Sequence, residues 1–211
     1  MSTATVFVPE IEERGIPAEQ EWPRQGNWPP QGKWTYEDYR RLPDDGWIYE
    51  VIEGELYMSP PPIPIHQENS GNLYVAFHNY AKKHDAGKVY DAPIEVILAD
   101  WANPVQPDIV FITKERLHIV KRSRIEGAPD IIVEVLSPSN WLTDRREKFE
   151  IYAKAGVREY WIVNPNARTI ELFFQREGRY ELIGKYGVDE TVRSEILPGF
   201  EVKVEEVCPV R

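Results

Sequence analysis

Two acidic residues interrupt apolar stretches that are typical of buried strands. Asp108 lies in VQPDIVFI at residues 105–112, and Glu134 lies in DIIVEVL at residues 130–136. A carboxylate in such a setting is costly unless a metal ion or a cation pairs with it. Carboxylates suit magnesium or manganese, which keep waters that a substrate phosphate can replace and which activate an attacking water. The two acids therefore indicate a divalent-metal site that could hydrolyse a phosphate ester.

A helical segment after the second strand, at residues 143–155, carries a lysine that fits this chemistry. Lys148 lies about 40° around the helix axis from Tyr152, at the edge of the apolar stripe. A lysine beside the metal stabilises developing charge or orients the attacking water. Spacing supports a second interpretation equally well, in which Asp108 only caps a turn and Lys148 pairs with Asp144 on the helix surface.

The rest of the chain supplies the elements that must position these residues. Residues 48–58 alternate as a hairpin with Glu53-Gly54 at its turn. Residues 66–85 have an apolar stripe at helical spacing, with His66 in the first turn and off that stripe. Further short strands are expected at residues 88–91, 94–98, 105–112, 130–136, 158–163, 169–174, 180–183 and within 195–204. Hairpin signals with two core helices predict a mixed α/β (α+β) sheet with helices packed on it.

Residues 1–33 are expected to form an extended Pro/Gly/Trp-rich arm, ahead of a single domain at residues 34–211. A six-residue repeat spaces Trp22, Trp28 and Trp34 along this arm, where proline and glycine disfavour helix. Three exposed indoles would be unfavourable in water, so we expect them to pack on the domain or on a second subunit. A loose tail with incidental tryptophans is almost equally well supported. Directly after the arm, Thr35 and Asp38 form a capping-box pattern that predicts a short helix.

Composition excludes several classes of protein. The chain has 211 residues, a formal net charge of −10 and a single cysteine, Cys208. One cysteine cannot build a disulfide framework or a cysteine-rich zinc site. No run of 18 apolar residues or secretory signal is present, so we expect a cytoplasmic protein without a membrane span. The negative charge counts against generic nucleic-acid binding without excluding it, because residues 114–124 (KERLHIVKRSR) are locally basic.

Five segments together resemble one known family. YEVIEGELYM, PPPIPIHQ, VQPDIVFI, GAPDIIVEVLSPSN and GVREYWIVNP are similar to the Uma-two family of restriction endonucleases, within the PD-(D/E)XK nuclease superfamily. The resemblance covers about residues 34–200 and is most specific at residues 128–165. It implies a restriction-endonuclease-like core and hydrolysis of DNA that depends on magnesium or manganese. Cutting both strands of a duplex also favours a homodimer.

Carried onto this chain, the resemblance makes Asp108 and Glu134 both catalytic and metal-binding. The carbonyl of Val135 would be a further metal ligand. His66 and one of Glu50 or Glu53 match a histidine and an acidic position near the family's site, and His66 and Glu53 are our catalytic candidates.

One position departs from the superfamily pattern. The superfamily's lysine would fall at residue 136, which is Leu136 in this chain. The resemblance implies that the lysine has moved to the following helix, as Lys148. On an alternating strand Leu136 points to the same side as Glu134, so a helix returning over that strand end could bring Lys148 across the gap.

Three functions remain open at this point. The first is a magnesium-dependent DNA endonuclease. The second is a nuclease-fold module that binds DNA or joins a complex without turnover, and the third is a metal-dependent hydrolase of another phosphate ester. Nicking of plasmid DNA separates the first two, because a binding module would retard DNA without cutting it.

Overall fold

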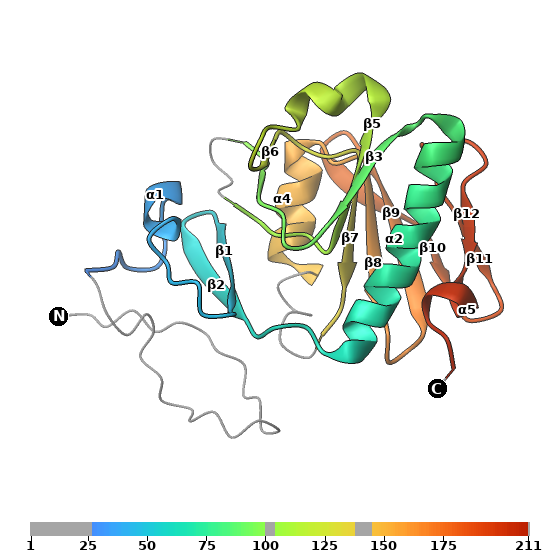
Figure 1. Cartoon of the computed structure of the whole chain (residues 1–211), viewed down its shortest axis with the longest axis horizontal. Coiled ribbons are helices and arrows are strands. Elements are labelled where there is room, and N and C mark those ends of the chain that lie inside the picture. Colours follow the sequence, from blue (N-terminus) through green and yellow to red (C-terminus); the bar gives the residue numbers. More distant parts are fainter. Residues whose placement is uncertain (1–26, 100–103, 138–144, 211) are drawn as a thin grey trace.

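A six-stranded mixed sheet forms the centre of the computed structural model, which describes residues 27–99, 104–137 and 145–210 (Figure 1). The strand order is β10-β9-β8-β7-β5-β3, in which β7 and β8 are parallel and the other neighbours are antiparallel. The strands are β3 Gly87–Asp91, β5 Ile109–Thr113, β7 Ile131–Val135, β8 Glu159–Asn164, β9 Thr169–Arg176 and β10 Arg179–Tyr186. The predicted mixed sheet flanked by helices is therefore confirmed.

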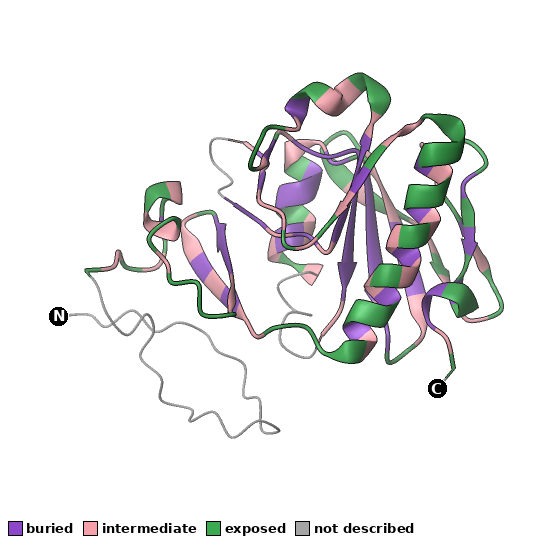
Figure 2. Cartoon of the chain, viewed as in Figure 1, coloured by how far each residue is buried: buried purple, intermediate pink, exposed green. Residues whose placement is uncertain are grey.

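One long helix covers each face of this sheet. Helix α2, Pro64–His84, packs on one face, and α4, Glu147–Ala155, packs on the other as the crossover between parallel strands β7 and β8. Figure 2 shows β7 and β8 buried between the two helices. A strand that is covered on both faces needs apolar residues at nearly every position. This explains the almost continuous apolar sequence of β7, whose five residues are all buried.

Alternation along β7 decides which face each side chain meets. Ile131 and Val133 belong to the core on the α2 side, whereas Ile132 belongs to the core on the α4 side. Because successive side chains point to opposite faces, Glu134 points to the α4 side with Ile132. The crossover helix thus lies above the carboxylate of Glu134.

Several predicted strand boundaries shift in the structure. Strand β5 begins at Ile109 instead of residue 105, and Val105 forms an isolated bridge with Val96. Pro107 lacks the backbone N–H that would continue the ladder. Strand β4, Val96–Ile97, is shorter than expected and pairs in parallel with β6, Ile125–Glu126.

The C-terminal part and the basic segment also differ from the expectation. One short strand was expected near the C-terminus; it is β12, Glu201–Lys203, and it pairs with an additional strand, β11, Thr191–Arg193. A short helix, α5 Val204–Val207, follows β12. The basic segment begins with a 3-10 helix, η1, Lys114–Ile119.

Residues 27–59 form a small N-terminal lobe that lies beside the sheet (Figure 1). It contains α1, Tyr36–Tyr39, and the hairpin of β1, Ile48–Ile52, and β2, Glu55–Ser59. The expected turn is present, with left-handed φ values of 49° at Glu53 and 82° at Gly54, as a two-residue hairpin turn of type I′ requires. The capping box at the start of α1 is confirmed too.

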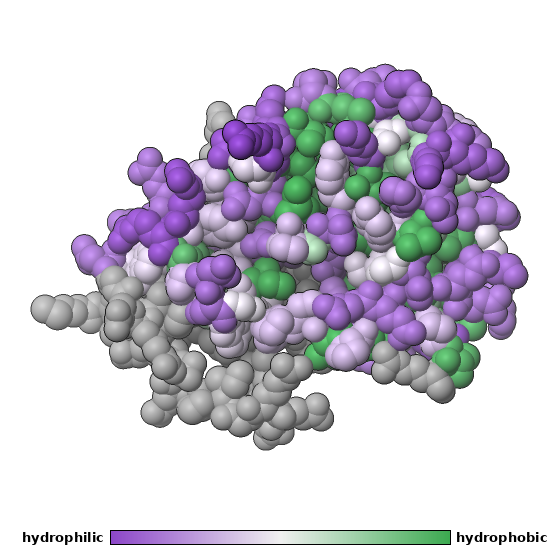
Figure 3. Space-filling model, viewed as in Figure 1, coloured by the Kyte–Doolittle hydropathy of each residue, from purple (hydrophilic) through white to green (hydrophobic). Residues whose placement is uncertain are grey.

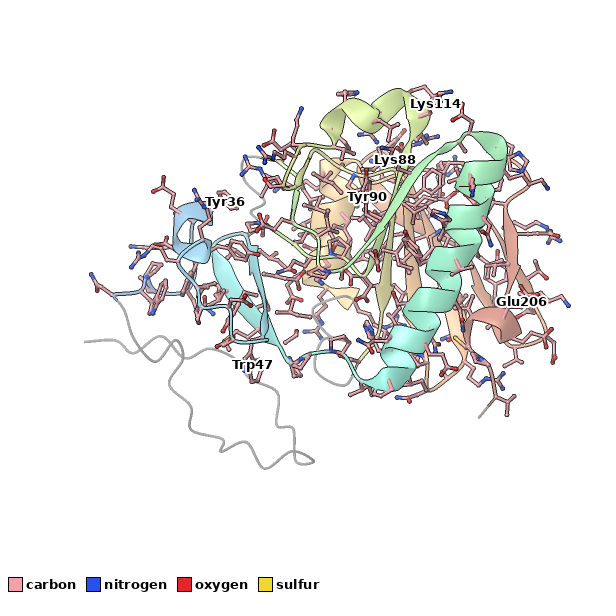
Figure 4. The ribbon with its side chains drawn as sticks, in the orientation of Figure 1. Tyr36, Trp47, Lys88, Tyr90, Lys114 and Glu206 are labelled. Atoms are coloured by element: carbon pink, nitrogen blue, oxygen red, sulfur yellow. The ribbon has the colours of Figure 1, made fainter. Side chains whose placement is uncertain are left out.

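The N-terminal lobe has its own core and also contacts the body of the molecule. Its core consists of Trp34, Tyr49, Val51, Leu56 and Met58. Trp28 stacks on Trp34 with ring centroids 5.4 Å apart, whereas Trp22 lies outside the described residues. Tyr36 lies on the side of α1 that faces the body, and its hydroxyl donates to Glu95 at 3.1 Å (Figure 4).

Hydrophilic residues cover most of the face drawn in Figure 3, and apolar groups appear there as separate patches. Within the described part of the chain, no helix has the length and apolar character needed to cross a membrane.

Candidate active site

A buried lysine bridges two buried glutamates beneath helix α4. The ammonium of Lys148 lies 2.8 Å from Glu50 Oε2 and 3.1 Å from Glu134 Oε1. Only 3% of the Lys148 side chain is exposed to solvent. A charge this deeply buried is stable only when it is paired. The three side chains come from β1, β7 and α4, so the site joins the N-terminal lobe to the central sheet.

Glu134 receives a second donor from the same helix. The hydroxyl of Tyr152 donates to Glu134 Oε1 at 2.7 Å, and Tyr152 is fully buried. Residues four apart lie on the same side of a helix. Lys148 and Tyr152 are related in this way, and both therefore reach down to the same carboxylate oxygen.

Glu50 is fixed by the segment that precedes β5. The backbone N–H of Gln106 donates to Glu50 Oε1 at 2.8 Å. The side-chain amide of Gln106 donates in turn to the carbonyl of Tyr49 at 3.1 Å. These two bonds tie β1 to residue 106 and leave Glu50 Oε2 directed at Lys148.

Asp108 lies at the end of the neighbouring strand. Its Oδ2 accepts a hydrogen bond from the backbone N–H of Val135 at 2.7 Å and lies 3.1 Å from His66 Nε2. Ile109 pairs with Val133, so the antiparallel register, continued by one position, sets Asp108 opposite Glu134. His66 enters from the first turn of α2 and is buried.

The structure brings most of the predicted residues together but not all of them. Glu53 is a correction: it occupies the exposed turn of the hairpin, where it pairs with Lys154 at 3.3 Å. Glu50, two residues before the end of β1, contacts Lys148 instead. Alternation along the hairpin could not show whether Glu50 or Glu53 faces the site, because Glu53 lies in the turn, where the alternation of the strand ends. Asp144, the alternative partner of Lys148, lies outside the described residues.

Sequence reasoning missed two contributors. Tyr152 was assigned to the apolar stripe of the helix, and its hydroxyl gave no separate signal. Gln106 acts mainly through its backbone N–H, which any residue other than proline could supply. A tyrosine one turn after the lysine was the one detectable clue.

The charges of the candidate residues suit a divalent cation. Glu50, Asp108 and Glu134 contribute three negative charges and Lys148 one positive charge, which leaves an excess of two when His66 is neutral. Carboxylate oxygens are the ligands that magnesium and manganese prefer. One such ion would balance the excess charge of this buried cluster.

The same carboxylates already accept protein donors. In residues 27–99, 104–137 and 145–210, no three acidic, histidine or cysteine side chains converge as they would around an ion. Glu50 and Glu134 face the ammonium of Lys148, and Asp108 faces the backbone N–H of Val135 and the ring of His66. A bound ion would have to share these oxygens with the donors.

Three other buried acids have partners that explain them without a catalytic role. Asp130 pairs with Arg116 at 2.9 Å and accepts from the backbone N–H of Thr113 at 2.8 Å. Glu159 accepts from the indole of Trp161 at 2.9 Å, and burial raises the pKa of its carboxyl group. The third, Glu171, accepts two hydrogen bonds from one arginine. Burial of an acid therefore does not by itself mark the site.

A mixed sheet with acids at the ends of adjacent strands, and a lysine from the crossover helix, defines a restriction-endonuclease-like protein. Comparison with known sequences agrees, since residues 36–205 match the model of the Uma2 family, described as "Putative restriction endonuclease". The chain belongs to this family, as its motifs predicted.

Two relatives extend this result. The chain is 25% identical over 139 residues to a protein of Synechocystis sp. named "Uncharacterized protein slr1290". The matched region covers 65% of this chain and 72% of that protein. The fold is similar to the crystal structure of "a putative nuclease belonging to DUF820" from Anabaena variabilis, with a TM-score of 0.68 and 18% identity. That match covers 82% of this chain and 97% of the Anabaena chain, and at this identity it shows the fold alone.

Proposed function

We propose that the protein is a metal-dependent endonuclease that hydrolyses DNA phosphodiester bonds. The observation that carries the proposal is the pairing of Lys148 with Glu134 at the end of β7, next to Asp108 at the end of β5. Membership in a family described as restriction endonucleases supports DNA as the substrate. Two acids at adjoining strand ends and a lysine from the crossover helix are the groups that phosphodiester hydrolysis needs.

Asp108 and Glu134 would hold a magnesium or manganese ion, and the carbonyl of Val135 is proposed as a further ligand. The ion would supply Lewis-acid polarisation of the phosphoryl oxygen and a more acidic water. His66, in contact with Asp108 at 3.1 Å, would keep that carboxylate in one orientation. Its role is therefore proposed to be the placement of a ligand.

Lys148 would stabilise the charge that develops on the phosphoryl oxygens. A fixed ammonium in a water-poor site stabilises such charge far more than it would in bulk water. Glu50 and Glu134 hold the ammonium from two sides. We propose a homodimer as the working form in the cytoplasm, because two symmetry-related sites can cut both strands of a duplex.

Metal binding is the first test. Manganese and magnesium should raise the melting temperature of the wild-type protein by mass action, as followed by calorimetry. Asp108→Ala should abolish this rise while its circular dichroism stays native. Asp130→Asn is a poor control because Asp130 anchors two strands, so the exposed Glu181→Gln serves as the matched acid variant, with an unchanged response.

Nicking of supercoiled plasmid is the second test. The wild type should nick in the presence of magnesium and stop when the metal is chelated. Retardation of the plasmid without nicking would assign a DNA-binding module, and a normal manganese response in Asp108→Ala would remove Asp108 from the site.

A further inference from the structure

Glu171 lies two strands away from Glu134, in the same row of paired residues across the sheet. Glu134 pairs with Ile162 across β7 and β8, and Ile162 pairs with Glu171 across β8 and β9. Directly opposed residues point to the same face of a sheet. Glu171 therefore faces α4, as Glu134 does, about 10 Å further along the sheet at the usual strand spacing.

A bidentate arginine connects Glu171 to the start of helix α4. The guanidinium of Arg145 donates from Nη1 to Glu171 Oε2 and from Nη2 to Oε1, both at 2.9 Å. The ammonium of Lys185 lies 3.0 Å from Glu171 Oε1. The Glu171 side chain is 8% exposed, so the fork is held in a mostly buried position. Paired donors of this kind fix direction as well as distance.

The first turn of α4 is held by the ion pairs of Lys148 and, just before the helix begins, by Arg145. Within the described residues, no side-chain hydrogen bond caps the helix at Arg146. An uncapped first turn leaves backbone N–H groups unsatisfied and frays readily. Lys148 lies in that turn, three residues after Arg145. Arg145 contacts Glu171 and Lys148 contacts Glu134, so the anchor and the lysine both point toward the sheet.

We propose that Glu171 is a positioning residue, which holds Arg145 and thereby keeps the first turn of α4 where Lys148 meets Glu134. The proposal rests on the proposed function, because it assigns Glu171 to the placement of that site's lysine. Phe149, in the first turn of α4, packs on Phe173, and Tyr152, one turn after Lys148, bonds to Glu134. Arg145 adds an attachment on the N-terminal side of these contacts.

Chemical labelling of lysines tests the proposal independently of activity. In the wild type, Lys148 should react slowly with an acetylating reagent and the exposed Lys114 quickly, as read by mass spectrometry of peptides. Glu171→Gln should increase labelling of Lys148 several-fold, because the first turn opens more often. Arg145→Lys, which keeps the charge but loses the fork, should do the same to a smaller extent. Glu181→Gln, which removes an exposed pair with Arg176 on the same hairpin, should leave Lys148 protected.

Plasmid nicking supplies the second readout. Glu171→Gln should lower kcat on the order of tenfold to a hundredfold, since small misplacements of a catalytic group have such effects. It should leave manganese affinity unchanged. In a Lys148→Met background the same substitution should have no further effect on rate. Glu171 does not position the lysine if Lys148 stays protected in both Glu171→Gln and Arg145→Lys. The same conclusion follows if the rate losses of Glu171→Gln and Lys148→Met simply multiply in the double variant. A wild type without nicking would refute the proposed function, and the labelling result would still decide the role of Glu171.

Discussion

Lys148 brings one positive charge between two buried carboxylates, and this defines what its replacement should do. Lys148→Met keeps the volume of the side chain but leaves Glu50 and Glu134 unpaired. Breaking a buried pair in this way costs about 3–5 kcal/mol of stability. The loss of one charged stabiliser should lower the nicking rate roughly 10²–10³-fold. Urea unfolding and plasmid nicking measure the two effects.

Leu136→Lys in that background provides the control. Residue 136 lies on the same side of the strand as Glu134, so the new ammonium should recover part of the stability and part of the rate. A Lys148→Met protein that nicks at the wild-type rate would contradict the role of this lysine.

The two glutamates of the hairpin form a matched pair. Glu50 is buried against Lys148, whereas the Glu53 side chain is 59% exposed and pairs with Lys154. Glu50→Gln should reduce nicking at least tenfold, because the ammonium loses one of its two charged partners. Exposed pairs contribute about 0–1 kcal/mol, so Glu53→Gln should leave rate and melting temperature unchanged. Equal effects of the two substitutions would show that Glu50 does not hold the lysine.

At the residue scale, the sequence revealed candidates but could not rank them. An acid inside an apolar strand pointed to Asp108 and Glu134, and it would point equally to Asp130, which the structure assigns to an ion pair with Arg116. The difference lies in the partners, and those come from parts of the chain that are distant in sequence. Burial cost is the same for a structural and a catalytic carboxylate.

At the element scale, the anchor of α4 should give stability a distinct pH dependence. Burial alone would raise the pKa of Glu171, but hydrogen bonds and charges from Arg145 and Lys185 outweigh burial and lower it below its usual 4.5. A group whose pKa falls on folding stabilises the protein above its unfolded pKa, and this contribution disappears as pH falls through the folded pKa.

Glu171→Gln should therefore be less stable than wild type by about 1–3 kcal/mol at pH 7, the usual range for hydrogen bonds to charged groups. Because Lys185 is mostly exposed, solvent screening favours the lower end. The difference should shrink as pH falls below about 4.5, because the carboxylate is protonated first in the unfolded state and, at still lower pH, in the folded protein too. Urea unfolding across this pH range measures it. A stability difference between wild type and Glu171→Gln that grows toward acid pH would contradict a lowered pKa of Glu171.

Elements with strong local signals were predictable, and their boundaries less so. The hairpin turn follows from its glycine, the capping box of α1 from Thr35 and Asp38, and the sheet strands from alternation and apolar runs. The start of β5 and the pairing of β11 with β12 depend on partners that the sequence pattern does not reveal. The crossover of α4 above Glu134 follows from the parallel pairing of β7 and β8, which local periodicity cannot specify.

At the scale of the whole molecule, the N-terminal lobe is part of the site because it supplies Glu50. Its hairpin is joined to the preceding segment by Gln31, whose side-chain amide donates to the carbonyl of Leu56 at 2.9 Å and accepts from its N–H at 2.7 Å. The N–H of Trp34 donates to the carbonyl of Gly54 at 2.9 Å, and Trp28 stacks on Trp34. Residues 27–33, together with Trp34, are therefore bonded to the hairpin at its turn and at its second strand.

Deletion of residues 2–33 should accordingly destabilise the lobe and reduce nicking. The truncated protein loses the Gln31 bonds, about 1 kcal/mol each, and leaves the buried Trp34 without Trp28. Its melting temperature should fall by several degrees, and sedimentation should show whether its oligomeric state changes. Gln31→Ala in the full chain separates the hydrogen bonds from the rest of the arm. If the truncated protein matches the full chain in melting, sedimentation and nicking, the arm is only a tail and the hairpin holds Glu50 without it.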